Sequence, residues 1–267
     1  MLTLALGVAY LFIVVVFALF AFILKVIDGK GLLASMTVGF AVIYGGGITW
    51  FVIVAVFFTL GVAFTLYKYN YKKKLGSAQG KRGERSWPNI LANGGLASVF
   101  AVGEFLRQDP AFEALFLGAV AAAAADTVAT ELGLLNKTQP RLITRPAMAV
   151  SPGTSGGVSL CGYLGAFVAS MAIGVMALAL RVMGTSPLVI AFCVTAGMGG
   201  ATVDSVIGAT VQRKGICKVC QKQTEELTHC GERTKMTGGI AFVENNFVNV
   251  IATLAGAIFF LTIATLA

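Results

Sequence analysis

Runs of apolar residues, each about 20 residues long, recur from one end of the chain to the other and alternate with short polar segments. An α-helix of about 20 apolar residues crosses the ~30 Å hydrocarbon core of a bilayer, so this pattern predicts an all-α, polytopic bundle of transmembrane helices. We expect one integral membrane domain over residues 1–267, with about eight spans and seven or nine as the alternatives. The expected spans are 2–24, 32–44, 49–67, 88–106, 111–132, 157–180, 187–211 and 240–266.

Two features of these segments change the count. The segments 32–44 and 49–67 flank three consecutive glycines, Gly45 to Gly47, so one broken helix is the alternative to two spans. Residues 1–24 have no basic start and no small-residue cleavage motif, and we interpret them as a retained span. Charged residues make up only 12% of the chain, roughly half of the ~25% typical of soluble domains, which excludes an ordinary soluble protein.

Charge predicts the orientation of the bundle. The connections 25–31, 68–87, 133–156 and 212–239 hold 2, 7, 3 and 6 lysine and arginine residues, 18 of the 20 in the chain. Basic loops stay in the cytoplasm, so we expect these four connections there and both termini on the opposite side. The chain has no basic module interleaved with aromatic residues, so we expect no nucleic-acid partner. The lipid bilayer is an expected partner.

Two aspartates, Asp126 and Asp204, lie inside predicted spans. An acidic residue at the centre of a membrane helix costs about 2.5–3.5 kcal/mol, which indicates a function for each. Mg²⁺ is commonly held by one or two carboxylates plus phosphate oxygens, so the pair predicts a magnesium site. Hydrogen bonding between helices is the alternative. Both aspartates stand between small residues and precede Thr-Val or Ser-Val, which indicates an internal repeat.

The other polar residues of the spans gather at their predicted cytoplasmic ends. They are Asn93, Glu131, Gln212, Asn245, Asn246 and Asn249. A through-going channel would place polar groups along its whole length. The one-sided distribution therefore favours a site that is filled from the cytoplasm.

The segment Ser151-Pro-Gly-Thr-Ser-Gly-Gly157 precedes a predicted helix and predicts a phosphate site. Glycines let backbone N–H groups converge, Thr154 or Ser155 can cap the helix, and a helix N-terminus attracts anions. Close packing of small residues is the alternative. The chain has no Gly-x-x-x-x-Gly-Lys-Ser/Thr motif, so nucleotide binding would need another design. Arg85 ends the basic loop that starts at Lys68, and arginine suits bidentate phosphate contact.

The last predicted cytoplasmic loop, residues 212–239, contains Cys217, Cys220, His229 and Cys230. Disulfides are disfavoured in the cytoplasm, and three thiolates with one imidazole can complete a structural Zn²⁺ site. We therefore expect a small zinc knuckle, with free reduced thiols as the alternative.

Five motifs, in this order along the chain, resemble the transmembrane protein 19 family, which includes phytyl-phosphate kinase. They are Asp126–Gly133, Pro140–Thr144, Pro152–Gly157, Val203–Gln212 and Asn245–Asn249. Glu244 stands where relatives commonly have Asp. The cysteine loop has no counterpart in the plant and animal relatives, so zinc is not expected in the shared chemistry.

The resemblance implies a Mg²⁺-dependent phosphotransferase that moves a phosphoryl group from a nucleoside triphosphate, CTP in particular, to a prenyl monophosphate of phytyl or geranylgeranyl type. It implies catalytic roles for Asp126, Asp204, Glu131 and Arg85. The expected substrate-binding residues are Asn93, Arg141, Thr144, Arg145, Gly153, Thr154, Ser155, Gly156, Gly157, Ser205, Gln212, Asn245, Asn246 and Asn249.

Three other functions remain open from the sequence. A prenol kinase or a cytidylyltransferase that makes a CDP-lipid would use the same residue types. An ion-coupled transporter or lipid flippase would use the two aspartates as a proton or cation relay. The one-sided distribution of polar residues argues against this last class.

Overall fold

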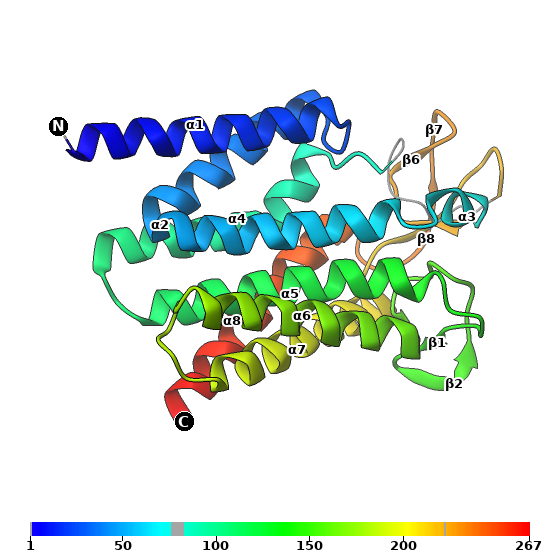
Figure 1. The fold of residues 1–267 in the computed structure, drawn as a ribbon. Helices are drawn as coiled ribbons and strands as arrows, with labels where there is room; N and C mark the ends of the chain where they lie inside the picture. Colours follow the sequence, from blue (N-terminus) through cyan, green and yellow to red (C-terminus); the bar gives the residue numbers. More distant parts are fainter. Residues whose placement is uncertain (1, 76–82, 222) are drawn as a thin grey trace.

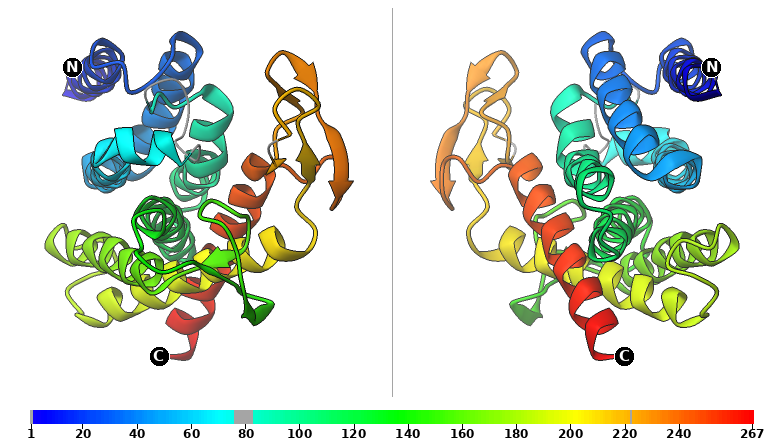
Figure 2. Two further views of the ribbon diagram at one scale, coloured as in Figure 1. Left: turned by 90° about the vertical axis from the view of Figure 1, so that its right-hand side faces the viewer. Right: turned by 90° about the vertical axis from the view of Figure 1, so that its left-hand side faces the viewer.

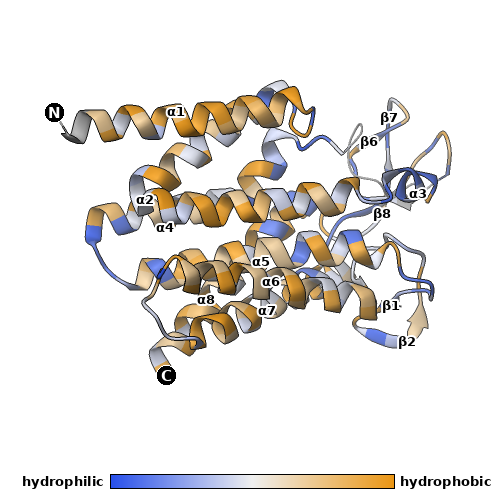
Figure 3. Cartoon of the chain, viewed as in Figure 1, coloured by the Kyte–Doolittle hydropathy of each residue, from blue (hydrophilic) through white to orange (hydrophobic). Residues whose placement is uncertain are grey.

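The computed structural model describes residues 2–75, 83–221 and 223–267. Within them, seven helices are long and apolar enough to cross a membrane, which confirms the predicted all-α class (Figure 1; Figure 3). They are α1 (Leu2–Ile23), α2 (Gly29–Leu66), α4 (Trp87–Arg107), α5 (Ala111–Gly133), α6 (Leu160–Ala179), α7 (Leu188–Thr210) and α8 (Asn245–Leu266). A short helix, α3 (Tyr69–Lys74), follows α2.

Helix α2 folds back on itself at Gly47, whose φ of 77° and ψ of −172° are not helical. A straight helix would place Gly31 and Gly61 about 45 Å apart. A Cβ at either glycine would instead touch the same residue, lying 2.9 Å from the carbonyl oxygen of Arg85 at Gly31 and 2.0 Å from its Nη2 at Gly61. The two halves therefore run in opposite directions. The first half starts and the second half ends at the same side of the bundle (Figure 1). Each half is about 27–29 Å long, so the seven helices make eight passes.

Aromatic residues of α1 hold the two halves of α2. Tyr10 packs edge-on against Tyr44 near the fold-back, and Phe17 packs edge-on against Phe51 and Phe58 in the second half. The hydroxyl of Tyr44 also donates to the carbonyl of Gly7 at 3.0 Å. Edge-to-face contacts are favoured by the quadrupoles of the rings.

Helix α5 lies at the centre of the bundle and contacts α2, α4, α6, α7 and α8 (Figure 2). Its residues Ala119–Ala125 are buried, with at most 1% of each exposed. The neighbouring helices meet this stretch with glycine: a Cβ at Gly200 of α7 or at Gly256 of α8 would lie 2.5 Å from the Cβ of Ala122. Membrane helices pack this closely where small residues let their backbones approach.

The described residues form eight short strands, which lie at the end of the bundle away from the termini (Figure 1). The sheet β2-β1-β3 joins α5 to α6. Two further sheets, β5-β4-β8 and β6-β7, join α7 to α8. The strands are β1 (Arg141–Leu142), β2 (Arg145–Ala149), β3 (Gly157–Val158), β4 (Lys214–Ile216), β5 (Gln223–Thr224), β6 (Thr228–His229), β7 (Glu232–Arg233) and β8 (Lys235–Gly238).

Two predicted span boundaries are wrong at their N-terminal ends. The predicted span 157–180 begins as a helix only at Leu160, because Gly157 and Val158 form the strand β3. The predicted span 240–266 becomes a helix at Asn245, and residues before it form turns. Both stretches are apolar in composition but are not helical, so hydropathy extended both segments too far.

Candidate active site

A polar cavity opens between the ends of α4, α5, α7 and α8 that carry the loops. Its lining is Arg85, Asn89, Asn93, Asp126, Thr127, Thr130, Asp204, Asn245 and Asn249. Six of these nine residues were predicted as site residues from the sequence. The cavity brings together residues that are up to 164 positions apart in the chain, from Arg85 to Asn249.

Helical spacing explains why these side chains share the cavity. Asn89 and Asn93, Asp126 and Thr130, and Asn245 and Asn249 are pairs four residues apart. Residues four apart lie on one helical face, so α4, α5 and α8 each present such a pair of polar groups to the same space. The Asn93 amide also donates to the carbonyl of Asn89 at 2.9 Å, which fixes its rotamer.

Asp126 and Asp204 line the cavity from α5 and α7 and repel each other electrostatically. The Oδ2 atom of Asp204 is buried and has no hydrogen-bond partner among the described residues. Buried carboxylate oxygens almost always have a partner, and a cation would satisfy both the free oxygen and the repulsion. Carboxylate and amide oxygens are the ligands that Mg²⁺ prefers, so the residues present fit that ion.

Arg85 lies at the cavity wall with only 6% of the residue exposed. Its Nη2 has no hydrogen-bond partner among the described residues, and its guanidinium stands over the rings of Phe57 and Phe58 at 5.7 and 5.6 Å. Burial lowers the pKa of Arg85 to about 10, while the Glu131 carboxylate acts in the opposite direction. Arg85 is therefore cationic at neutral pH and holds a free donor for an anion.

The backbone of Arg85 is fixed by the segment that precedes α2. Its N–H donates to the carbonyl of Val26 at 2.9 Å, and the N–H of Asp28 donates to its carbonyl at 3.2 Å. The side chain crosses the second half of α2 at Gly61, where any Cβ would collide with it. The fold-back of α2 therefore creates the slot through which Arg85 reaches the cavity.

A second, apolar cavity lies between α1, α2 and α4. Phenylalanine, valine and alanine side chains form most of its wall, for example Phe17, Val38 and Val54. Arg85 and Asn93 belong to the walls of both cavities. The apolar cavity therefore adjoins the polar, carboxylate-lined cavity at Arg85 and Asn93.

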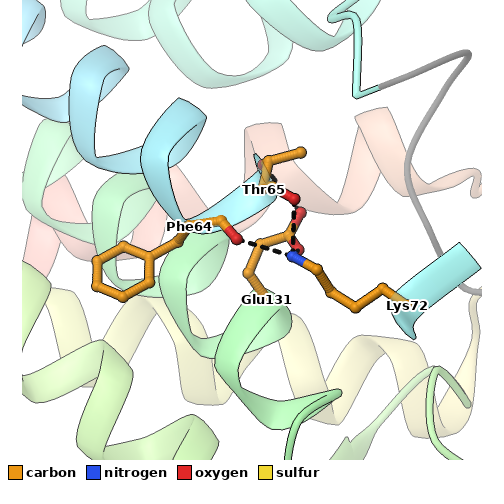
Figure 4. A network of polar contacts seen from close by, with 4 residues as sticks. All are labelled: Phe64, Thr65, Lys72 and Glu131. Carbon is orange, nitrogen blue, oxygen red and sulfur yellow. Dashed lines mark hydrogen bonds and ion pairs between the residues drawn. The ribbon is translucent and has the colours of Figure 1, made fainter. Parts of the chain in front are cut away.

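Glu131 was predicted as a catalytic residue, but it does not line the polar cavity. It forms a buried ion pair with Lys72 and accepts a hydrogen bond from Thr65 Oγ1 at 2.9 Å (Figure 4). Lys72 Nζ also donates to the carbonyls of Phe64 and Thr65 at 2.7 and 2.8 Å. The structure gives Glu131 a role in joining α3, α2 and α5, and its catalytic role stays a prediction.

The predicted phosphate loop packs against α7 beside the site. Gly156 has a φ of 75°, and a Cβ there would lie 2.4 Å from the backbone nitrogen of Ala209. Glycine is therefore needed at position 156 for close packing. Close packing was the alternative to phosphate binding that the sequence left open for this loop. The predicted cap at Thr154 or Ser155 is wrong: Ser159 caps α6 and accepts from the N–H of Gly162 at 3.1 Å.

The remaining predicted site residues lie outside the cavity wall. Arg141 Nη1 donates to the carbonyls of Pro146 and Ala147 and closes the β1–β2 hairpin, on which Thr144 and Arg145 are exposed. The other residues in this group are Gly153, Thr154, Ser155, Gly157, Ser205, Gln212 and Asn246. Substrate binding by these residues stays a prediction.

Four residues near the cavity were missed from the sequence. Asn89, Thr127 and Thr130 line it, and helical spacing from Asn93 and Asp126 would have found Asn89 and Thr130. Glu225 is close enough to Asp204 to repel it and accepts a hydrogen bond from Gln212 Nε2 at 2.6 Å. No pattern in the sequence indicates Glu225, because a loop brings it to the site.

Fold and cavity together define a polytopic helical membrane protein with carboxylates at an intramembrane site. The family model described as integral membrane protein DUF92 matches residues 12–257, and the chain belongs to this family. The family resemblance predicted from the motifs is thereby confirmed.

Several relatives align over most of the chain. Protein PGR of Arabidopsis thaliana is 30% identical over 253 residues, which cover 86% of each chain. An uncharacterised membrane protein of Methanocaldococcus jannaschii is 29% identical over 88% of this chain and 84% of its own length. The protein named VTE6, chloroplastic, of A. thaliana is 28% identical over 70% of this chain and 57% of its own length. No solved structure matches the chain.

Proposed function

We propose that the protein is a membrane-embedded phosphotransferase that moves a phosphoryl group from a nucleoside triphosphate, preferentially CTP, to a prenyl monophosphate. The observation that carries this proposal is the junction of the two cavities at Arg85 and Asn93. A prenyl phosphate has an apolar tail and an anionic head, and the two cavities offer matching surroundings on either side of one arginine. The family resemblance to phytyl-phosphate kinase, drawn from the five motifs, supports the same substrate class.

Five of the nine lining residues have a task in this reaction. Asp126 and Asp204 would hold Mg²⁺, which supplies charge neutralisation for the donor phosphates when bound. Arg85 would bind the acceptor phosphate through its free donor, and Asn245 and Asn249 would orient donor oxygens or the ribose. Phosphoryl transfer asks a protein mainly for positioning and for neutralisation of charge, which this set of groups provides.

The proposed transfer needs no strong general base. An oxygen of the acceptor monophosphate, already anionic, attacks the terminal phosphorus of the triphosphate, and the bond from that phosphorus to the β-phosphate oxygen breaks. The products are a prenyl diphosphate and a nucleoside diphosphate. The prenyl tail in the apolar cavity would gain about 0.8 kcal/mol for each buried CH₂ group.

The site would take its nucleotide from the cytoplasm. The described residues of the basic connections lie at the end of the bundle away from both termini (Figure 1; Figure 3). The residues that line the polar cavity belong to the same ends of α4, α5, α7 and α8. Basic loops favour the cytoplasmic side, so the polar cavity would face that compartment.

The test uses purified protein in detergent with Mg²⁺, CTP and geranylgeranyl or phytyl monophosphate, and mass spectrometry identifies the products. Wild-type protein should form the diphosphate, and Asp126→Asn and Asp204→Asn should abolish it. Asp109→Asn removes an exposed carboxylate between α4 and α5 and should leave the rate unchanged. Absence of diphosphate with CTP, ATP, GTP and UTP would refute the proposal. A monophosphate made from free prenol, or a CDP-lipid, would identify the other two enzyme classes.

A further inference from the structure

Four metal-ligand side chains meet in the loop between α7 and α8, outside the polar cavity. Cys217, Cys220, His229 and Cys230 each offer one ligand atom, and these atoms lie within 4.8 Å of one another. The Nδ1 atom of His229 is 3.5 Å from Cys220 Sγ and 3.3 Å from Cys230 Sγ. Cys217 is fully buried, whereas Cys220 and Cys230 are exposed.

These distances match a tetrahedral zinc site. Zn–S bonds of about 2.3 Å and Zn–N bonds of about 2.1 Å place the ligand atoms of a tetrahedron roughly 3.5–3.8 Å apart. The sulfur–nitrogen separations at His229 fall at the short end of that range or just below it. Three sulfurs and one nitrogen select zinc over magnesium or calcium, which prefer oxygen ligands.

The backbone explains how neighbouring residues serve one metal. Successive side chains of an extended strand point to opposite sides, so His229 and Cys230 would normally diverge. His229 ends β6, but Cys230 has a φ of 52° and Gly231 a φ of 80° in the turn before β7. The left-handed turn breaks the alternation and directs both side chains to the same point. Left-handed backbone is uncommon for cysteine and indicates a constraint at this position.

Outside the ligand set, one buried arginine organises the same loop. Arg213 is 3% exposed and donates through Nη1 to the carbonyls of Glu225 and Glu226 at 2.9 and 2.8 Å. Its Nη2 donates to Thr234 Oγ1 at 2.8 Å. Arg213 thus ties together the part of the loop that presents Glu225 to Gln212.

We propose that Cys217, Cys220, His229 and Cys230 bind one Zn²⁺ that orders the loop between α7 and α8. Four protein ligands fill the tetrahedron, so the site is structural and has no open position for a substrate. This zinc site stands independently of the phosphotransferase activity proposed above.

The test measures the metal content of the full chain purified in detergent without added metal. Inductively coupled plasma mass spectrometry should find about one zinc per chain in the wild type. Cys217→Ser and Cys220→Ser should lose it, whereas Cys161→Ser, a cysteine of α6, should keep it. Replacement by Co²⁺ should give the visible bands of tetrahedral cobalt with thiolate charge transfer. No zinc in the wild type, or full zinc in Cys217→Ser, would overturn the proposal.

A second measurement covers the case in which the cysteine variants fail to fold. Removal of zinc from the folded wild type with a chelator should expose the loop to trypsin near Arg213 and Arg233, and re-addition of zinc should restore protection. Cleavage that is the same before and after chelation would contradict an ordering role for the metal. Both readouts are independent of nucleotide turnover, so their failure is distinguishable from failure of the phosphotransferase proposal.

Discussion

Lys72 and Glu131 form an ion pair in which both side chains are almost completely buried, with exposures of 1% and 3%. The pair joins the short helix α3 to the central helix α5, 59 residues further along the chain. Thr65 Oγ1 and two backbone carbonyls satisfy the remaining hydrogen-bonding groups of the pair (Figure 4). A buried charge without its partner is costly, so each residue depends on the other.

Lys72→Met should destabilise the protein by about 3–5 kcal/mol, because it leaves the Glu131 carboxylate buried without a cation. Lys72→Met combined with Glu131→Leu should recover much of that loss, since no uncompensated charge remains. Denaturant titration in detergent measures the free energy of unfolding. Lys73→Met removes an exposed lysine of the same helix and should change stability by less than about 0.5 kcal/mol. Equal losses in the single and double variants would show that the ion pair is not the source of the effect.

Arg85→Ala should lower kcat/KM for the prenyl monophosphate by roughly 10- to 150-fold. A hydrogen bond to a charged group contributes about 1.5–3 kcal/mol, and Arg85 has a free donor at the junction of the two cavities. The matched control is Arg107→Ala, which removes an exposed arginine at the far end of α4. Steady-state kinetics with both substrates decides the assignment, and an unchanged kcat/KM in Arg85→Ala would remove Arg85 from the acceptor site.

Ala55→Phe should shift the enzyme toward shorter prenyl chains. Ala55 lines the apolar cavity, and a phenylalanine there would fill space that a long tail needs. Each displaced CH₂ group costs about 0.8 kcal/mol, so the ratio of kcat/KM for geranylgeranyl to geranyl monophosphate should fall several-fold or more. Val99→Phe enlarges an exposed side chain of α4 and serves as the control. A ratio that does not change would place the tail elsewhere.

Much of the fold follows from the sequence, because hydropathy reports directly on the bilayer. The glycine triplet before Ile48 indicated a break, and the structure shows a complete fold-back there. Three of the four span termini that adjoin the polar cavity were also placed within two residues of the observed helix ends: 88, 132 and 211 against Trp87, Gly133 and Thr210. Local sequence carries these features, so no knowledge of tertiary contacts is needed.

The site was only partly predictable, for a physical reason. Asp126 and Asp204 stand out because charge is expensive in a membrane helix, whatever the tertiary structure. Glu131 was expected to be catalytic from the family resemblance, yet it forms an ion pair with a lysine of α3, and sequence separation hides that partner. Glu225 was missed because a polar residue in a polar loop gives no signal, and only the folded loop brings it toward Asp204.

The carboxyl of Glu225 should make stability depend on pH. Partial burial raises its pKa from 4.5 to about 7, although Lys214 lowers it and Glu226 raises it further. Asp204 and Glu225 repel each other, and Arg213 donates to the backbone carbonyl of Glu225. Between pH 4.5 and about 7 the folded protein holds a proton that the unfolded chain releases.

Stability should therefore fall as the pH rises across that window and level off above it. Glu225→Gln should flatten this part of the profile of Tm against pH, measured in detergent without added Mg²⁺. Glu232→Gln changes an exposed glutamate of the same loop and should leave the slope unchanged. A slope that persists in Glu225→Gln would assign the dependence to another group.

Ala122→Val should destabilise the bundle by about 1–3 kcal/mol, the usual cost of overpacking. The Cβ of Ala122 already faces Gly200 and Gly256 at distances that leave no room for a single added carbon on either glycine. Denaturant titration in detergent again gives the difference. Ala191→Val adds the same two carbons on the exposed face of α7 and should have little effect. A stable Ala122→Val protein would mean that α5 can move away from its neighbours.

The alanine run of α5 has a consequence for how variation in this chain is interpreted. Five identical, featureless residues resemble filler, and a measure of compositional complexity would rank them among the least informative positions. All five are nevertheless buried, with at most 1% of each exposed. At Ala122, Gly200 and Gly256 bring the neighbouring helices so close that methyl is close to the largest group that fits. The repeated alanine therefore reflects a steric limit on side-chain size. Natural variants in this stretch should be rarer than its low compositional complexity suggests.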